Sequence, residues 1–360
     1  MGWAPTTDQI LDLDGVRRRS DSFVFELCDR NLVPIGTLHP DRGNPMSVEV
    51  DTSSSTRRLR GLRLMPDEVA DVNVLSDRLR VYMVLQNDVR FRLGTFLWGD
   101  ANRPVRSWGD EQHSDLVDMS WVLAQPVTQA FGWGTGGRIW LIMLFLLLRA
   151  GFQAEDVAVI GSEADRGLAE PVSWQPGTTW AQMLGDLCNI VGFAPPWFDR
   201  DGLVHLDQPP DPARDPATVP AYEAGGRIVA DSIVRSDDLL SAPNDFAVFT
   251  SSGERIIAGR SQLPTSAPHS FATRGFRVGL VESAQGLETQ DQANKAAATL
   301  ARTKSVAFEW LSWSSTLDPR HDVWDVVDVL GDRWLETRWS MELKSGGQMS
   351  HTARRTTYAL

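Results

Sequence analysis

The sequence contains little cysteine. Its 360 residues include two cysteines, Cys28 and Cys188, which are too few for a disulfide framework or for a zinc site built from four thiolates. Cysteine without such partners is usually a small buried apolar residue. We therefore expect two buried structural thiols, and the sequence leaves open whether they pair.

A long apolar run is also absent. The longest, residues 139–148, has ten residues, whereas a helix that spans a bilayer needs about 20. The N-terminal segment carries Asp8, Asp12 and Asp14 without an apolar core, which does not fit a secretory signal. The expectation is no membrane-spanning segment and no signal peptide.

Lysine is rare, and its absence excludes one class of phosphate site. The chain has 35 basic residues, and no lysine precedes Lys295. The glycine-rich stretch Gly132-Trp133-Gly134-Thr135-Gly136-Gly137 precedes an expected helix, but it lacks the lysine of a phosphate loop. It also lacks the surrounding strand–helix–strand unit of a dinucleotide site. A turn followed by a helix start explains these glycines.

Motifs for catalysis and metal binding are missing as well. No Gly-x-Ser-x-Gly sequence is present to expose a serine nucleophile. Asp199, Asp201 and Gly202 resemble the start of a calcium loop without its later oxygen ligands, so we expect a tight hairpin turn there. No two histidines have the spacing of a helical zinc motif; the six are His39, His113, His205, His269, His321 and His351. We therefore predict no catalytic, metal-binding or cofactor-binding residues, no cofactor and no enzyme activity.

The negative charge is unevenly distributed. The formal net charge is −12, and residues 101–230, with 8 basic and 16 acidic side chains, supply −8 of it. An acidic body repels phosphate backbones, which argues against tight nucleic-acid binding. Nucleic acid could still pass the protein without being held.

The first hundred residues show the alternation of apolar and polar side chains that is typical of β-strands. The clearest hairpin pairs residues 78–86 with residues 89–97 around the turn Asn87-Asp88. Polar residues between the apolar ones indicate a sheet with one solvent-facing side, as in a sandwich or barrel. Residues 1–110 are the first expected domain.

Residues 111–215 form the second expected region, a helix and hairpin segment. Two helices are predicted, each opened by Gly-Thr and closed by Gly-Phe, over residues 134–152 and 177–193. Thr179 and Gln182 can form a capping box for the second helix, and Gly192 fits its C-terminus. The first helix is apolar nearly all round, so we expect it to be buried in the fold or against another subunit. A strand, tight turn and strand follow at residues 195–206.

Residues 216–360 are the third expected domain, and a proline-rich linker at residues 209–220 leads into it. Short strands are expected around Phe246 and Val248 and around Leu280. An alanine-rich helix follows at residues 289–304. The final expected elements are strands at residues 306–313, 323–329 and 333–343 and a turn at Gly346-Gly347.

Taken in order, these elements resemble the tail hub (minor tail) proteins of tailed bacteriophages, especially those of actinobacterial hosts. These proteins are similar in architecture to the baseplate hubs of contractile phages. One departure concerns the turn before a closing strand, where the family usually has Gly-Asp-Val and this sequence has His321-Asp322-Val323-Trp324 after Pro319. The motifs that carry the resemblance are Thr56-Arg57-Arg58-Leu59-Arg60, Leu93-Gly94-Thr95-Phe96, Gly177-Thr178-Thr179-Trp180, Phe198-Asp199-Arg200-Asp201-Gly202, the alanine-rich helix from Ala293 to Ala301, Asp325-Val326-Val327-Asp328-Val329, and Trp339 to Leu343 with Gly346-Gly347-Gln348-Met349.

The resemblance implies an α+β, mostly β fold with two β-barrel-like tube domains and a small helix and hairpin insertion region. It implies a structural protein of the virion, made in the host cytoplasm, whose homotrimer forms a ring at the distal end of the tail tube. Its partners would be the tail tube or distal tail protein, the tape measure protein and other tail-tip proteins, and DNA would pass without specific binding. The strands of residues 78–97 and 306–343 are the candidates for sheets that continue between subunits.

Two other functions remain open. A tail-associated cell-wall hydrolase would need converging acids or a metal site, and no separate domain of that kind is apparent. A carbohydrate-binding tail protein would use exposed members of the 14 tryptophans. Trp180, Trp310, Trp313 and Trp339 lie on helix or strand patterns, so core packing or subunit contact explains those four.

Overall fold

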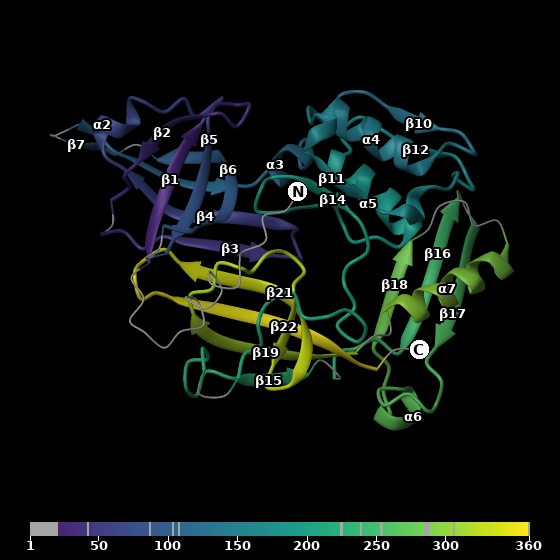
Figure 1. Cartoon of the computed structure of the whole chain (residues 1–360). Coiled ribbons are helices and arrows are strands. Elements are labelled where there is room, and N and C mark those ends of the chain that lie inside the picture. The colour runs from purple at the N-terminus through teal and green to yellow at the C-terminus, as the bar shows by residue number, and fades with distance from the viewer. Residues whose placement is uncertain are drawn as a thin grey trace. The chain divides into compact units, whose positions relative to one another are not determined.

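The computed structural model describes residues 21–358 except 42, 86–87, 103, 107–108, 224–225, 238–239, 253–254, 284–288 and 305–306. The chain forms two compact units. Unit 1 comprises Met1–Asp231 and Trp313–His351, and unit 2 comprises Ser232–Ser312 and Thr352–Leu360. Strands dominate both units and helices are fewer (Figure 1), so the expected α+β, mostly β class is confirmed.

A large antiparallel sheet forms the framework of unit 1. Its strands pair in the order β21-β3-β4-β9-β6-β5-β1-β2, and β20 also pairs with β21. Along β3, β4 and β5, buried side chains, most of them apolar, alternate with partly exposed side chains, most of them polar, as the sequence indicates. The strands are β1 Ser22–Cys28, β2 Pro34–Leu38, β3 Ser47–Asp51, β4 Thr56–Leu64, β5 Arg78–Val84, β6 Arg90–Asn102, β9 Gln112–Val117, β20 Val326–Val329 and β21 Asp332–Glu342.

The expected hairpin is present as β5 and β6, with Arg78 opposite Leu97 and Val84 opposite Arg90. Of its expected turn residues, Asn87 lies outside the described residues. β5 is paired with β1 and β6, and β6 is paired with β5 and β9. Both edges of β5 are thus paired within the chain, whereas β6 pairs with β9 only over residues 97–102, so continuation of β6 into a neighbouring subunit stays a prediction.

The second expected region of the sequence contains the longer helices of unit 1, α4 and α5, whereas the short α2 lies in the first expected domain. α5 begins where the Thr179 hydroxyl accepts a hydrogen bond from the Gln182 backbone N–H, and ends at Gly192 in the left-handed conformation. The turn between β13 and β14 is tight, as predicted, and the Asp199 carboxylate accepts hydrogen bonds from the N–H groups of Asp201 and Leu203. The elements are α2 Pro66–Val69, β7 Val105–Arg106, β8 Gly109–Asp110, α3 Ser120–Leu123, β10 Phe131–Trp133, α4 Ile139–Ala150, the 3-10 turns Ala154–Asp156 and Ser162–Ala164, β11 Val157–Ile160, β12 Val172–Trp174, α5 Trp180–Val191, β13 Trp197–Phe198 and β14 Val204–Leu206.

The apolar helix α4 is buried on one face only. Ile142, Met143 and Leu146 are within the core of unit 1. Three apolar side chains of α4 remain exposed: Leu141 by 48%, Phe145 by 43% and Leu148 by 45%. Phe145 follows Leu141 by four residues and Leu148 follows Phe145 by three. These three form one stripe along the helix surface.

Unit 2 contains a smaller sheet of three strands in the order β17-β16-β18, with α7 packed against it (Figure 1). The predicted inner face of α7 is confirmed, because Ala293, Ala297 and Ala301 are buried. β19 and β22 are long strands that begin in one unit and end in the other. The elements are β15 Val234–Asp237, β16 Asp245–Ser252, β17 Arg255–Gln262, α6 Phe271–Arg274, β18 Gly279–Ser283, α7 Gln290–Lys304, β19 Ala307–Thr316 and β22 Gln348–Tyr358.

Cys28 and Cys188 are both buried and free, as expected. Burial raises the pKa of the Cys188 thiol to about 12, which keeps it protonated at neutral pH. Among the described residues, no helix combines the length and hydrophobicity needed to cross a bilayer.

The close approach of α7 to β17 predicts a large effect of one methyl group. A Cβ added at Gly259 would lie 2.0 Å from the backbone oxygen of Ala293, so Gly259→Ala must displace the helix. We expect unit 2 to lose about 1–3 kcal/mol of stability. Faster amide hydrogen exchange in β17 and α7 measures this loss.

Gly185→Ala is the matched control, because a Cβ at Gly185 in α5 meets no atom within 4 Å. An alanine in a helix interior is favoured over glycine by about 0.5–1 kcal/mol. Exchange in α5 should therefore slow. Equal effects of the two substitutions would contradict the packing described for α7.

Candidate functional site

Polar and charged side chains are concentrated in the segment that joins β19 to β20. This segment includes His321 and Asp322, where the sequence departs from the tail-hub pattern. Asp318 and His321 are almost fully buried. Ionisable side chains are rarely buried in proteins unless they have partners. Partners come from elements far away in the sequence, all within unit 1.

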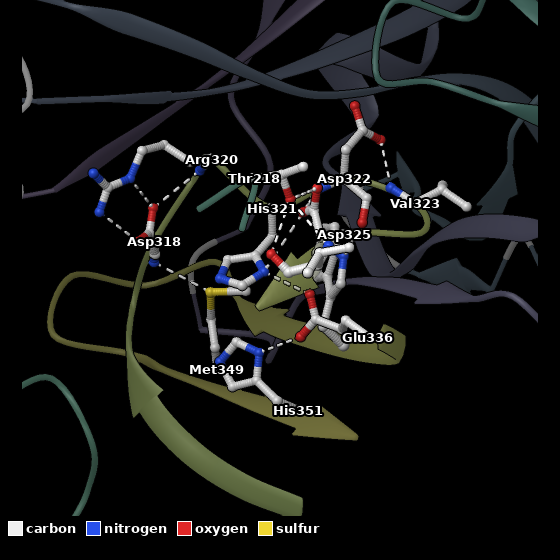
Figure 2. A network of polar contacts seen from close by, with 12 residues as sticks. Thr218, Asp318, Arg320, His321, Asp322, Val323, Asp325, Glu336, Met349 and His351 are labelled. Atoms are coloured by element: carbon white, nitrogen blue, oxygen red, sulfur yellow. Dashed lines mark hydrogen bonds and ion pairs between the residues drawn. The ribbon is translucent and has the colours of Figure 1, made fainter. Parts of the chain in front are cut away.

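Glu336 on β21 lies between two histidines (Figure 2). Its Oε2 is 2.6 Å from His321 Nδ1, and its Oε1 is 2.6 Å from His351 Nδ1. The other ring nitrogens also have partners, because His321 Nε2 lies 2.6 Å from the Tyr222 hydroxyl and His351 Nε2 lies 2.8 Å from the Ser315 hydroxyl. The result is one continuous chain of five side chains, which we call the imidazole–carboxylate network.

The protonation states follow from burial. Burial lowers the pKa of His321 and of His351, so both imidazoles are neutral at pH 7. Each then donates one N–H, through Nδ1, to the Glu336 carboxylate, and each accepts a hydroxyl proton through Nε2. Burial raises the pKa of Glu336, while the hydrogen bond that His351 donates opposes that rise. Each N–H and O–H donor in the network thereby has an acceptor.

His321, Glu336 and His351 could together offer a metal ion three ligand atoms within 4.8 Å of one another. Their geometry is that of hydrogen bonds instead. The two imidazoles approach opposite oxygens of a single carboxylate at 2.6 Å, which places the carboxylate between the nitrogens rather than all three ligands around a common point. These residues do not fit a metal ion.

Asp318 forms a second buried group with two arginines. Arg320 donates from Nε to Oδ1 at 2.8 Å and from Nη2 to Oδ2 at 2.7 Å, and Arg227 also pairs with Oδ2. Burial alone would raise the pKa of Asp318, but these hydrogen bonds and charges hold it well below its usual range. The Arg227 guanidinium lies 4.7 Å above the Tyr222 ring, which joins this group to the imidazole–carboxylate network.

Asp322 is the centre of a third group. It pairs with Arg57 of β4, which is fully buried, and its Oδ2 accepts a hydrogen bond from Arg200 Nε at 2.9 Å. Burial raises the pKa of Asp322, but the two guanidinium groups overcome that effect and lower it to about 2. Arg200 also donates to the backbone oxygens of Pro319 and Arg320. Asp322 thus connects the sheet, the β13–β14 turn and the β19–β20 segment.

The sequence analysis named no site residues, and it missed these three groups. The burial of Arg57 could have been predicted from the sequence, because it lies two residues before Leu59 and therefore on the same, core-facing side of β4. No sequence signal marks His321 and His351, which lie 15 residues on either side of Glu336. Pairing of β22 with β21 brings His351 to Glu336, and pairing of β20 with β21 brings the segment that contains His321. None of the three groups leaves a nucleophile open to solvent, so the arrangement holds backbone segments in place.

No protein-family model and no curated protein sequence matches this chain. Solved structures do match it. The 43 kDa tail protein of prophage MuSo2 from Shewanella oneidensis is 11% identical, with a TM-score of 0.63 over 93% of this chain and 98% of that one. A tail protein from Neisseria meningitidis MC58 is 11% identical, with a TM-score of 0.59 over 93% and 97%.

The fold is that of phage tail proteins. The tail-protein fold includes both units, because the similarity covers nearly the whole of this chain and of the two tail proteins. A chain in the half-lidded Francisella PdpA–VgrG complex is 7% identical and has a TM-score of 0.57. That match covers 97% of this chain and 60% of the Francisella chain.

Proposed function

We propose that this chain is a structural hub protein of a phage tail tip. The observation that carries the proposal is the full-length similarity in fold to two prophage tail proteins. The three buried polar groups support it, because they connect distant segments of unit 1 and expose no reactive group. The Francisella chain belongs to a complex, which favours assembly with other tail-tip proteins.

The finer features of the proposal come from the resemblance to tail hubs. Three copies form a ring at the distal end of the tube, from two barrel-like domains per chain within residues 1–110 and 216–360, and residues 111–215 pack beside them. Tape measure protein and DNA pass through the ring. The exposed stripe Leu141, Phe145 and Leu148 supports a contact with another protein, because such apolar surface is usually covered in an assembly.

Two alternatives have less support. A cell-wall hydrolase needs accessible acids or a metal, and the carboxylates of the three groups described above are occupied by arginine or histidine partners. A tryptophan-rich sugar-binding protein needs many exposed indoles, whereas five of the described tryptophans are buried: Trp174, Trp313, Trp324, Trp334 and Trp339.

Quantitative mass spectrometry of purified tails tests the proposal. The chain should be present in a fixed ratio of three copies per tail, and the purified protein should release no fragments from host peptidoglycan. Absence of the chain from tails would refute the structural role. Release of peptidoglycan fragments would favour the hydrolase.

A further inference from the structure

A hollow on the exposed side of the unit 1 sheet lies beside α3. It has a volume of about 690 Å³ and is lined by Arg58, Arg60, Trp98, His113, Asp115 and Trp121, among others. A neighbouring hollow of about 290 Å³ shares Arg58 and Trp121 and adds the hydroxyl side chains of Ser53, Ser54 and Ser120. Arg58 and Trp121 therefore lie where the two hollows meet.

The relative position of Arg58 and Trp121 is set by one buried carboxylate. Asp118 is 2% exposed, and its Oδ2 accepts the N–H of Arg57 at 2.8 Å. Its Oδ1 accepts the N–H of Ser120 at 3.1 Å and is also bonded to the Ser120 hydroxyl. The residues immediately before Arg58 and before Trp121 are thus held by the same side chain, so the backbone positions of the pair are held before any ligand arrives.

Both side chains are available to a ligand. Trp121 is 54% exposed, more than any other tryptophan that the structure describes. Arg58 makes no hydrogen bond or ion pair with any described residue, whereas Arg60 beside it donates to Asp115 at 2.7 Å. The hollow therefore offers one flat apolar surface and one guanidinium group that has no hydrogen-bond partner among the described residues, although its charge also acts on Asp115.

We propose that this hollow binds a saccharide that carries a carboxylate. The indole of Trp121 would cover the apolar face of a sugar ring, and the guanidinium of Arg58 would bind the carboxylate through two parallel N–H donors. The hydroxyl oxygens of Ser53, Ser54 and Ser120 could accept from sugar hydroxyls, since these serines already bond to Asp51, Thr56 and Asp118. This inference goes beyond the tail-hub proposal and holds whether or not the chain forms a ring.

The charges around the hollow favour isolated carboxylates over a dense polyanion. Asp115, with a 51% exposed side chain, and Glu49 are close to Arg60 and balance its charge. A nucleic acid would bring successive phosphates against these carboxylates, which is unfavourable. A saccharide with one carboxylate for every two sugar rings avoids most of the repulsion from Asp115 and Glu49.

Isothermal titration calorimetry of the full chain with a hyaluronan hexasaccharide tests the proposal, because this probe alternates a carboxylated and a neutral sugar. We expect saturable binding, and Trp121→Ala and Arg58→Gln should each weaken it about tenfold or more. Arg58→Lys should retain an intermediate affinity, because lysine keeps the charge without the paired donors. The neutral N-acetylglucosamine hexamer should bind more weakly than hyaluronan to the wild-type chain.

Arg214→Gln is the matched control, because its side chain is 85% exposed and lies outside the hollow. It should leave the affinity unchanged. Circular dichroism should show that all variants are folded, since none removes a buried side chain. No saturable binding at millimolar sugar, or equal binding by the wild type and both hollow variants, would overturn the proposal. Tighter, salt-sensitive binding of a thymidine dodecamer would overturn it in favour of a polyphosphate ligand.

Discussion

Asp322→Asn lowers the free energy of unfolding of unit 1 by about 3–5 kcal/mol. The substitution removes the carboxylate that Arg57 and Arg200 share. Arg57 is fully buried, so its charge has no access to water once the carboxylate is gone. A lone buried charge costs far more than the pair it replaces contributes.

Urea unfolding at pH 7, followed by tryptophan fluorescence, measures this effect. Asp165→Asn is the matched control, because its ion pair with Arg138 is exposed and such pairs contribute at most about 1 kcal/mol. If Asp322→Asn lowers the free energy of unfolding by no more than Asp165→Asn does, the role given to Asp322 is contradicted.

The same experiment has a pH dependence of known sign. The pKa of Asp322 is about 2 in the folded protein and 3.8 in its ordinary state. Its contribution to stability is therefore present above pH 3.8 and is lost as the pH falls through 3.8 toward 2. The difference between the wild type and Asp322→Asn should shrink over that window, while the difference for Asp165→Asn stays small throughout.

Glu336→Leu has the second large expected effect, a loss of about 2–5 kcal/mol, because it leaves the Nδ1–H groups of two buried histidines without an acceptor. Glu336→Gln should cost much less. Its amide oxygen can accept from His321, and its NH₂ can face His351 if that ring moves its proton to Nε2. The Ser315 hydroxyl permits the change, because it can donate to the Thr316 backbone oxygen at 2.8 Å.

The two Glu336 variants are compared by urea unfolding, and the ring proton positions by nitrogen NMR of labelled histidine. The expected order of stability is wild type, then glutamine, then leucine. In the glutamine variant, only His351 should change its tautomer. Equal losses for both variants would mean that charge on Glu336, rather than its ability to accept hydrogen bonds, holds the network together.

Local patterns in the sequence predicted the local structure well. Alternation identified β5 and β6, and Thr179 with Gly192 marked the two ends of α5. β22 was not predicted, because its core-facing positions are Met349, His351 and Ala353, which do not form an apolar alternation. The buried polar groups depend on strand pairing between distant segments, which residue spacing alone does not reveal.

Polar residues at core-facing strand positions were the one signal available for the buried groups. Arg57 and Glu336 both occupy such positions, and each requires a partner that local sequence cannot name. Their partners, Asp322 and the two histidines, come together only when the sheet is assembled. The resemblance to tail hubs predicted the fold class, and the buried groups pair His321 and Asp322, where the sequence departs from the family pattern, with residues from other parts of the chain.

Cryo-electron microscopy of whole tails, with the chain identified by a tag fused to its C-terminus, tests the central claim most directly. The account predicts three copies in a closed ring around the axis at the distal end of the tube. Copies located away from the axis, or a particle that lacks the chain, would contradict it.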